Sequence, residues 1–194
     1  MIDVSIGYQI AAASFILFAL LGAFDGIYFH IYKYKLHLHP PAQFEHQIHS
    51  FRGILFIPIV FLFFVLNSAG SLLWLGIALL AIDFVAELID ILIEKEARAD
   101  LGGISPMETA IHVTATGFRM AAIAIIISLK PLEAFYWSTA TSQMVALPEY
   151  LQWAGLVFMS GLILSLLGQS ILTLRNNNPI NRVISKPNKC LWSQ

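Results

Sequence analysis

Five stretches of this chain are each long and apolar enough to cross a lipid bilayer, which takes about 20 residues in a helix. Of the 194 residues, 58% are hydrophobic and 12% are charged, whereas soluble domains carry about a quarter charged residues. The pattern predicts an all-α, polytopic membrane protein with one domain over residues 1–175 and a polar tail over 176–194. The expected transmembrane helices cover roughly residues 8–33, 43–66, 70–96, 106–129 and 151–174.

The third of these helices carries four carboxylates on one face. Asp83, Glu87, Asp90 and Glu94 follow one another at helical spacing in an otherwise apolar segment. Carboxylates in line repel each other and are costly in hydrocarbon, so neighbouring groups must neutralise them. This stripe predicts that other helices bring cations or metal ions to the same depth.

Lysine and arginine residues are concentrated on one side of the predicted helices. They lie in the loop between helices 1 and 2, in the loop between helices 3 and 4, where Lys95 and Arg98 stand, and in the tail. The opposite side has only Lys130. The positive-inside rule then predicts an N-terminus outside and a C-terminus in the cytoplasm, for a protein of a bacterial inner membrane.

Two helix starts carry the same Glu-x-x-Ile-His motif, Glu45 to His49 and Glu108 to His112. Each follows a proline and has an arginine deeper on its helix, which suggests a duplicated helical hairpin. Helices 1–4 are therefore expected to form a four-helix bundle with a pseudo-twofold axis along the membrane normal, with helix 5 packed outside.

A glutamate and a histidine four residues apart lie on one helical face, where they can bind a common metal ion. The set resembles the di-iron and di-manganese carboxylate bundles of the ferritin-like class, although the Glu–His spacing is one residue longer here. That resemblance implies two divalent ions, with iron preferred over zinc or manganese. The expected ligands are Glu45, His49, Glu108, His112, Glu94, Asp90, His30 and Asp25.

The deeper charges are expected to support this site. Depth along the helices pairs Glu87 with Arg52 and Asp83 with Arg119. Seven carboxylates against these two arginines leave five negative charges, of which two divalent cations neutralise four. His46 is expected beside the ligands, and His37 and His39 in the interfacial loop, with a role in metal entry as the alternative.

These features favour a membrane-embedded di-metal oxidoreductase that acts on a lipophilic substrate from the cytoplasmic half of the bilayer. An acyl lipid, a sterol-like molecule or a quinone would suit such a site. Four other functions stay open: transport of divalent cations or protons, zinc-dependent lipid hydrolysis, haem binding by His49 and His112, and a subunit or assembly factor with a structural polar core. The net charge of −1 says nothing about a nucleic-acid partner, but the sequence has no basic patch and no such partner is expected.

Overall fold

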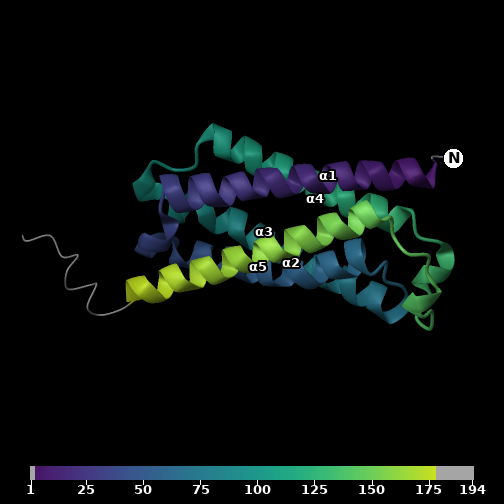
Figure 1. The fold of residues 1–194 in the computed structure, drawn as a ribbon. Coiled ribbons are helices and arrows are strands. Elements are labelled where there is room, and N and C mark those ends of the chain that lie inside the picture. The colour runs from purple at the N-terminus through teal and green to yellow at the C-terminus, as the bar shows by residue number, and fades with distance from the viewer. Residues whose placement is uncertain (1–2, 178–194) are drawn as a thin grey trace, which may run out of the picture.

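The computed structural model describes residues 3–177, and this part of the chain is helical without any strand. Five helices, long and apolar enough to cross a membrane, lie side by side in one elongated bundle (Figure 1). They indicate an integral membrane protein, as predicted. The polar tail expected over 176–194 lies outside the described residues from position 178 onward.

The first span joins α1 (Val4–Phe24) to η1 (Asp25–Lys33), and the second joins α2 (Gln43–Val60) to η4 (Phe61–Val65). The other three spans are formed by α3 (Gly70–Ala97), α4 (Pro106–Ser128) and α5 (Glu149–Asn177). Short 3₁₀ turns complete the connections: η2 (Leu36–Leu38), η3 (Pro40–Ala42), η5 (Ala99–Leu101), η6 (Leu132–Phe135) and η7 (Thr141–Gln143).

The closest helix pairs connect the two halves of the predicted repeat. α1 packs along α4, and α2 packs along α3. The sequential partners within each expected hairpin are further apart, and a cavity lies between the two close pairs. α5 lies against α1, α2 and η4, and it is the least buried of the five spans.

Polar and apolar side chains occupy opposite halves of the bundle. At the end that holds the N-terminus, the interior is an apolar core in which the rings of Phe15 and Phe64 stack with centroids 4.2 Å apart. Toward the other end, the same helices bury carboxylates and arginines instead. The candidate site is therefore confined to one half of the membrane-spanning region.

Lys130 joins two connections at the apolar end of the bundle. Its Nζ donates hydrogen bonds to Asn67 Oδ1 at 2.6 Å and to the carbonyl oxygen of Ser68 at 2.8 Å. Burial lowers the pKa of Lys130 from its ordinary value of 10.5 to about 8.

The folded protein is expected to become more stable as the pH rises from about 8 to about 10.5, because the unfolded chain binds more protons in this window. Below it, Lys130 is protonated in both states and the cost of burying its charge is fully present. Thermal unfolding in detergent should show the gain in the wild type and not in Lys130→Met. Lys95→Met, at an exposed position of α3, should keep the gain. An equal gain in Lys130→Met would contradict this assignment.

Candidate metal centre

The π-helix η1 brings two predicted ligands together. A π-helix joins residues five apart, as in the hydrogen bond of 2.9 Å from the Tyr34 N–H to the Phe29 carbonyl. Asp25 and His30 are five apart, and their Oδ2 and Nε2 atoms are separated by 3.7 Å. In an α-helix these two side chains would point roughly 140° apart around the axis. The wider turn is therefore what places both of them in the site.

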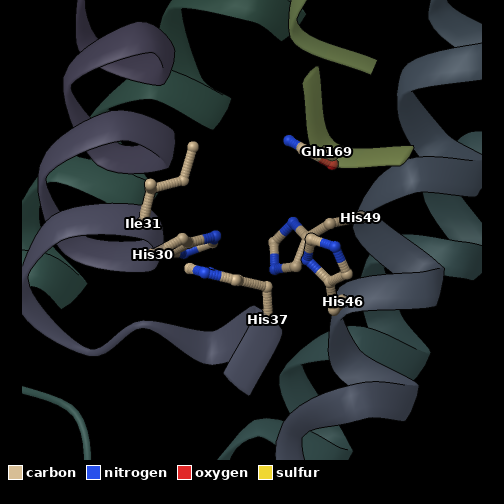
Figure 2. A pocket seen from close by; sticks show the side chains of 6 residues that line it. All are labelled: His30, Ile31, His37, His46, His49 and Gln169. Carbon is tan, nitrogen blue, oxygen red and sulfur yellow. The ribbon is translucent and has the colours of Figure 1, made fainter. Parts of the chain in front are cut away.

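Histidines from the second span and the preceding loop meet this segment. The His49 and His30 rings meet edge to face, with ring centroids 4.6 Å apart. His46 and His37 line a small cavity together with that pair (Figure 2). His46 lies in the first turns of α2, whereas His37 lies in η2.

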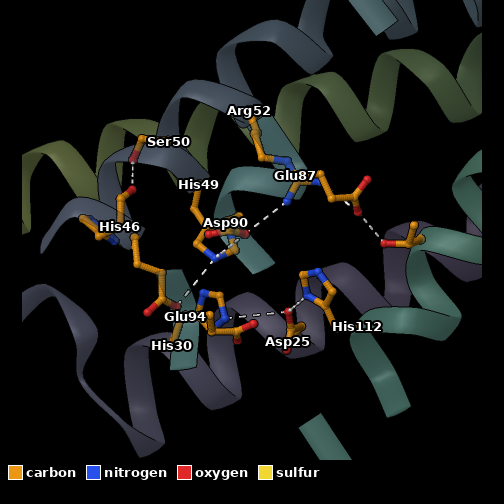
Figure 3. Close-up of polar contacts among 12 residues, drawn as sticks. Asp25, His30, His46, His49, Ser50, Arg52, Glu87, Asp90, Glu94 and His112 are labelled. Carbon is orange, nitrogen blue, oxygen red and sulfur yellow. Dashed lines mark hydrogen bonds and ion pairs between the residues drawn. The ribbon is translucent and has the colours of Figure 1, made fainter. Parts of the chain in front are cut away.

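His49 connects α2 with α3. Its Nε2 atom lies 3.8 Å from Glu45 Oε1, one turn earlier in its own helix. The same atom lies 3.3 Å from Asp90 Oδ2 on the acidic face of α3 (Figure 3). Glu45 is completely buried, and Asp90 is 1% exposed. The stripe of α3 thus faces the first Glu-x-x-Ile-His motif.

The glutamate and the histidine of the second motif contact different partners. Ser105, the residue before Pro106, caps α4 by accepting a hydrogen bond of 3.2 Å from the N–H of Glu108. Glu108 is buried and forms an ion pair with Arg98. His112 points toward Asp25, with 3.5 Å between Nδ1 and Oδ2 (Figure 3).

Two groups of side chains in the described residues have a geometry that can hold a metal ion. One contains His30, Glu45 and His49, and the other contains Asp25, His30 and Glu108; within each group the ligand atoms lie within 4.8 Å of one another. Five of the eight predicted ligands belong to these groups, and His30 belongs to both. The other three, Asp90, Glu94 and His112, lie beside the groups and contact their members or Arg98.

Several predicted ligands have a buried polar atom without a hydrogen-bond partner in the described part of the chain. These atoms are Asp25 Oδ1, Asp90 Oδ1, Glu108 Oε2 and His112 Nε2. A buried polar atom without a partner is costly, so each needs a water molecule, a ligand or an ion. Oxygen and imidazole nitrogen atoms are the donors that iron, manganese and zinc accept.

Arg98 belongs to the candidate site, although its position in the sequence predicts only a loop cation. The side chain is completely buried at the end of α3. Its guanidinium binds Glu45 and Glu108, and its Nη2 atom lies 3.2 Å from Glu94 Oε1 and 3.3 Å from His30 Nε2. One arginine therefore connects α2, α3, α4 and η1.

The sequence does contain a signal for Arg98. It follows Glu94 by four residues and continues the acidic face of α3 by one more turn, so the same spacing that aligns the acids aligns the arginine. Burial alone would lower the pKa of Arg98, but hydrogen bonds and charges from Glu45 and Glu108 outweigh this effect and raise the pKa above its ordinary value. Arg98 is a permanent cation.

The predicted ion pairs deeper in the bundle are present. Arg52 Nη2 lies 3.2 Å from Glu87 Oε1, and Arg119 binds Asp83. The pairs are also cross-linked, because Arg52 Nε lies 3.4 Å from Asp83 Oδ1 and Arg119 binds Glu87. Arg52 Nη1 further contacts Asp90 Oδ2 at 3.3 Å, which connects this layer to the candidate ligands (Figure 3).

The side chains of the site carry an excess of negative charge that two divalent cations would balance. Arg98 raises the number of guanidinium groups near the seven carboxylates from two to three, and four negative charges are left when the histidines are neutral. Ionised carboxylates without counter-charge are expensive in a membrane interior. The groups in this balance are Asp25, Glu45, Asp83, Glu87, Asp90, Glu94, Glu108, Arg52, Arg98 and Arg119.

A cavity of about 470 Å³ adjoins the candidate ligands. Its polar wall includes Asp25, His30, His49 and His112, and its lining also contains apolar residues of α1, α2 and α5. Three of these, Phe18, Phe56 and Phe158, form a ring cluster with centroid separations of 5.3 to 5.8 Å. The lining of the cavity thus has ionisable side chains in one region and an aromatic wall in another.

Comparison of the chain with protein-family models, with curated proteins and with solved structures gives no match.

Proposed function

We propose that this protein is a membrane-embedded, metal-dependent oxidoreductase with two divalent metal ions, iron preferred, and a lipophilic substrate. The observation that carries the proposal is the cavity in which His30, His49 and Asp25 adjoin an aromatic wall. Small-molecule sites are commonly apolar cavities of 300–1,000 Å³ with a few convergent polar groups. An acyl lipid, a sterol-like molecule or a quinone has the matching chemistry, an apolar body with a polar end.

The donor set supports iron ahead of the alternatives. Mixed carboxylate and imidazole ligands suit iron and manganese, whereas a catalytic zinc site uses three protein ligands and a water molecule. The four negative charges that the arginines leave unbalanced support two divalent ions. Bound iron would supply redox chemistry toward dioxygen or toward the substrate, and the protein would supply the positions of the groups.

The residues around the ligands have separate roles in this proposal. Arg52 and Arg119 form ion pairs with the deeper carboxylates and fix α2 and α4 against α3. His112 presents Nδ1 to Asp25, which leaves Nε2 as the nitrogen that can bind a metal ion or exchange a proton with a substrate. The aromatic wall excludes water from the part of the cavity that would hold an apolar chain.

A pseudo-twofold axis relating the first two helices to the next two is part of the proposal. Such an axis exchanges α1 with α3 and α2 with α4, so it converts the α1–α4 contact into the α2–α3 contact, and both exist. The glutamates of the two repeated motifs also bind the same guanidinium, that of Arg98. The lysine and arginine distribution supports a cytoplasmic location for this end of the bundle, in a bacterial inner membrane.

Transport of cations or protons has less support from the arrangement of side chains. Beyond Asp83 and Arg119, the interior of the described bundle is filled by side chains such as Phe63 and Ile126, which are at most 1% exposed. A path for ions needs polar groups or water through both halves. A bundle with polar side chains in one half alone suits a reaction site that opens toward one side of the membrane.

Filling the cavity is expected to block substrate without removing metal. Gly161 in α5 lines the cavity, and a Cβ atom added there meets no heavy atom within 4 Å. Gly161→Phe should raise KM for a short-chain quinol or an acyl lipid by about tenfold or more, at unchanged iron content. Oxygen consumption and metal analysis of the purified protein measure the two effects.

Gly168→Phe is the matched control, because Gly168 lies in the same helix with equal space around it and does not line the cavity. Equal KM values for the two variants would refute the cavity as the substrate site. Bound zinc with ester hydrolysis and no oxygen consumption would favour a hydrolase, and a protein without bound metal that carries cations across vesicles would favour a transporter.

A further inference from the structure

We propose that His30, His37, His46 and His49 form a transit site through which a transition-metal ion enters the candidate metal centre. This inference rests on the metal-dependent function proposed above and concerns how the centre is loaded. The four imidazoles line one small cavity, together with Ile31 and Gln169 (Figure 2). They come from three different elements, η1, η2 and α2.

The size of this chamber fits one ion. Its volume is about 20 Å³, and a cavity of about 10–15 Å³ by this measure holds a single water molecule. An organic substrate does not fit. A partly dehydrated metal ion does, because imidazole nitrogen atoms replace water in its coordination shell at about 2.0–2.1 Å for zinc.

The lining selects the kind of ion. Among the described residues, no carboxylate lines the chamber, so the strong ligands there are imidazoles. Imidazole suits iron, zinc, copper and nickel, whereas magnesium and calcium require oxygen ligands. A chamber of this composition passes transition-metal ions and rejects the far more abundant Mg²⁺. The carboxylate-rich centre beyond it does not discriminate in this way by its ligand types alone.

The position of the chamber connects the loop with the centre. His37 lies in the η2 turn between the first and second spans, and His46 lies in the first turns of α2. His30 and His49 also line the chamber and belong to the ligand group that contains Glu45. An ion held by His37 and His46 therefore moves to the centre by exchanging those two imidazoles for a carboxylate, while His30 and His49 stay bound.

The test measures loading of the full-length protein, purified without metal in detergent, with Co²⁺ alone. The absorption of bound Co²⁺ reports which ligands surround the ion as the centre fills. The variant with both His37→Ala and His46→Ala should load about 10–100-fold more slowly and reach the same final number of ions per chain. His39→Ala should load like the wild type, because His39 lies in the same loop and does not line the chamber. A large excess of Mg²⁺ should leave the loading rate of the wild type unchanged.

A second variant separates ligand chemistry from folding. Changing His37 and His46 to cysteine supplies thiolate ligands on shorter side chains, and loading should recover part of the way toward the wild-type rate. Equal rates in the wild type and in the double alanine variant overturn the transit site, as does a lower final metal content at an unchanged rate. A wild-type protein that binds no Co²⁺ at saturation refutes the proposed function itself, which is a distinct result.

Discussion

Replacing Arg98 with methionine is expected to destabilise the folded protein by roughly 3–5 kcal/mol. The guanidinium is completely buried and binds Glu45 and Glu108, both of which are also buried. Removing it leaves two carboxylates without their counter-charge in a membrane interior, where each is costly. Unfolding by SDS in mixed micelles, compared between the variant and the wild type, measures the loss.

Two controls make the Arg98 experiment specific. Lys95→Met removes an exposed cation three residues earlier and should change stability by about 0.5 kcal/mol or less. Combining Arg98→Met with Glu45→Gln and Glu108→Gln removes the unpaired charges and should recover a large part of the loss. If the triple variant were less stable than Arg98→Met, the ion-pair explanation would fail.

Replacing His30 with alanine is expected to remove all bound metal, whereas His49→Ala should remove only part of it. His30 belongs to both groups that can hold an ion, and His49 belongs to one. The wild type should contain about two ions per chain, as in other two-metal sites, and His49→Ala about half that number. Elemental analysis of purified protein after saturation with Fe²⁺ under anaerobic conditions provides the counts.

His39→Ala serves as the control for the loss of an imidazole outside both groups, and it should keep the full metal content. Full occupancy in His30→Ala would show that the metal lies elsewhere. Equal losses in the His30 and His49 variants would indicate one ion held by both residues, and the proposal of two ions would then be wrong.

Features that depend on regular helical geometry were predictable from the sequence. The five spans follow from apolar length, and the capping of α4 by Ser105 follows from the preference for serine before a helix-starting proline. The ion pairs Glu87–Arg52 and Asp83–Arg119 follow from depth, since each residue advances a helix by about 1.5 Å and buried charges must pair.

Other features depend on departures from that geometry, and the sequence signals them weakly. The π-helix η1 has no single residue that requires it, yet it alone brings Asp25 and His30 to the same side. Arg98 follows the last residue of α3, where an arginine normally reaches solvent or lipid headgroups. The close pairing of α1 with α4 depends on packing along the whole helix, and no pairwise motif records it.

The division of the bundle into a charged half and an apolar half has a consequence for the cell that carries it. A membrane that stores energy as a voltage must not leak protons, and chains of carboxylates and histidines conduct them readily. Here the packed side chains around Phe15, Phe63 and Phe64 lie between the charged half and the opposite end of the described bundle. In such a membrane, this packing would separate the ten acidic and basic side chains of the charged half from the opposite side of the bilayer.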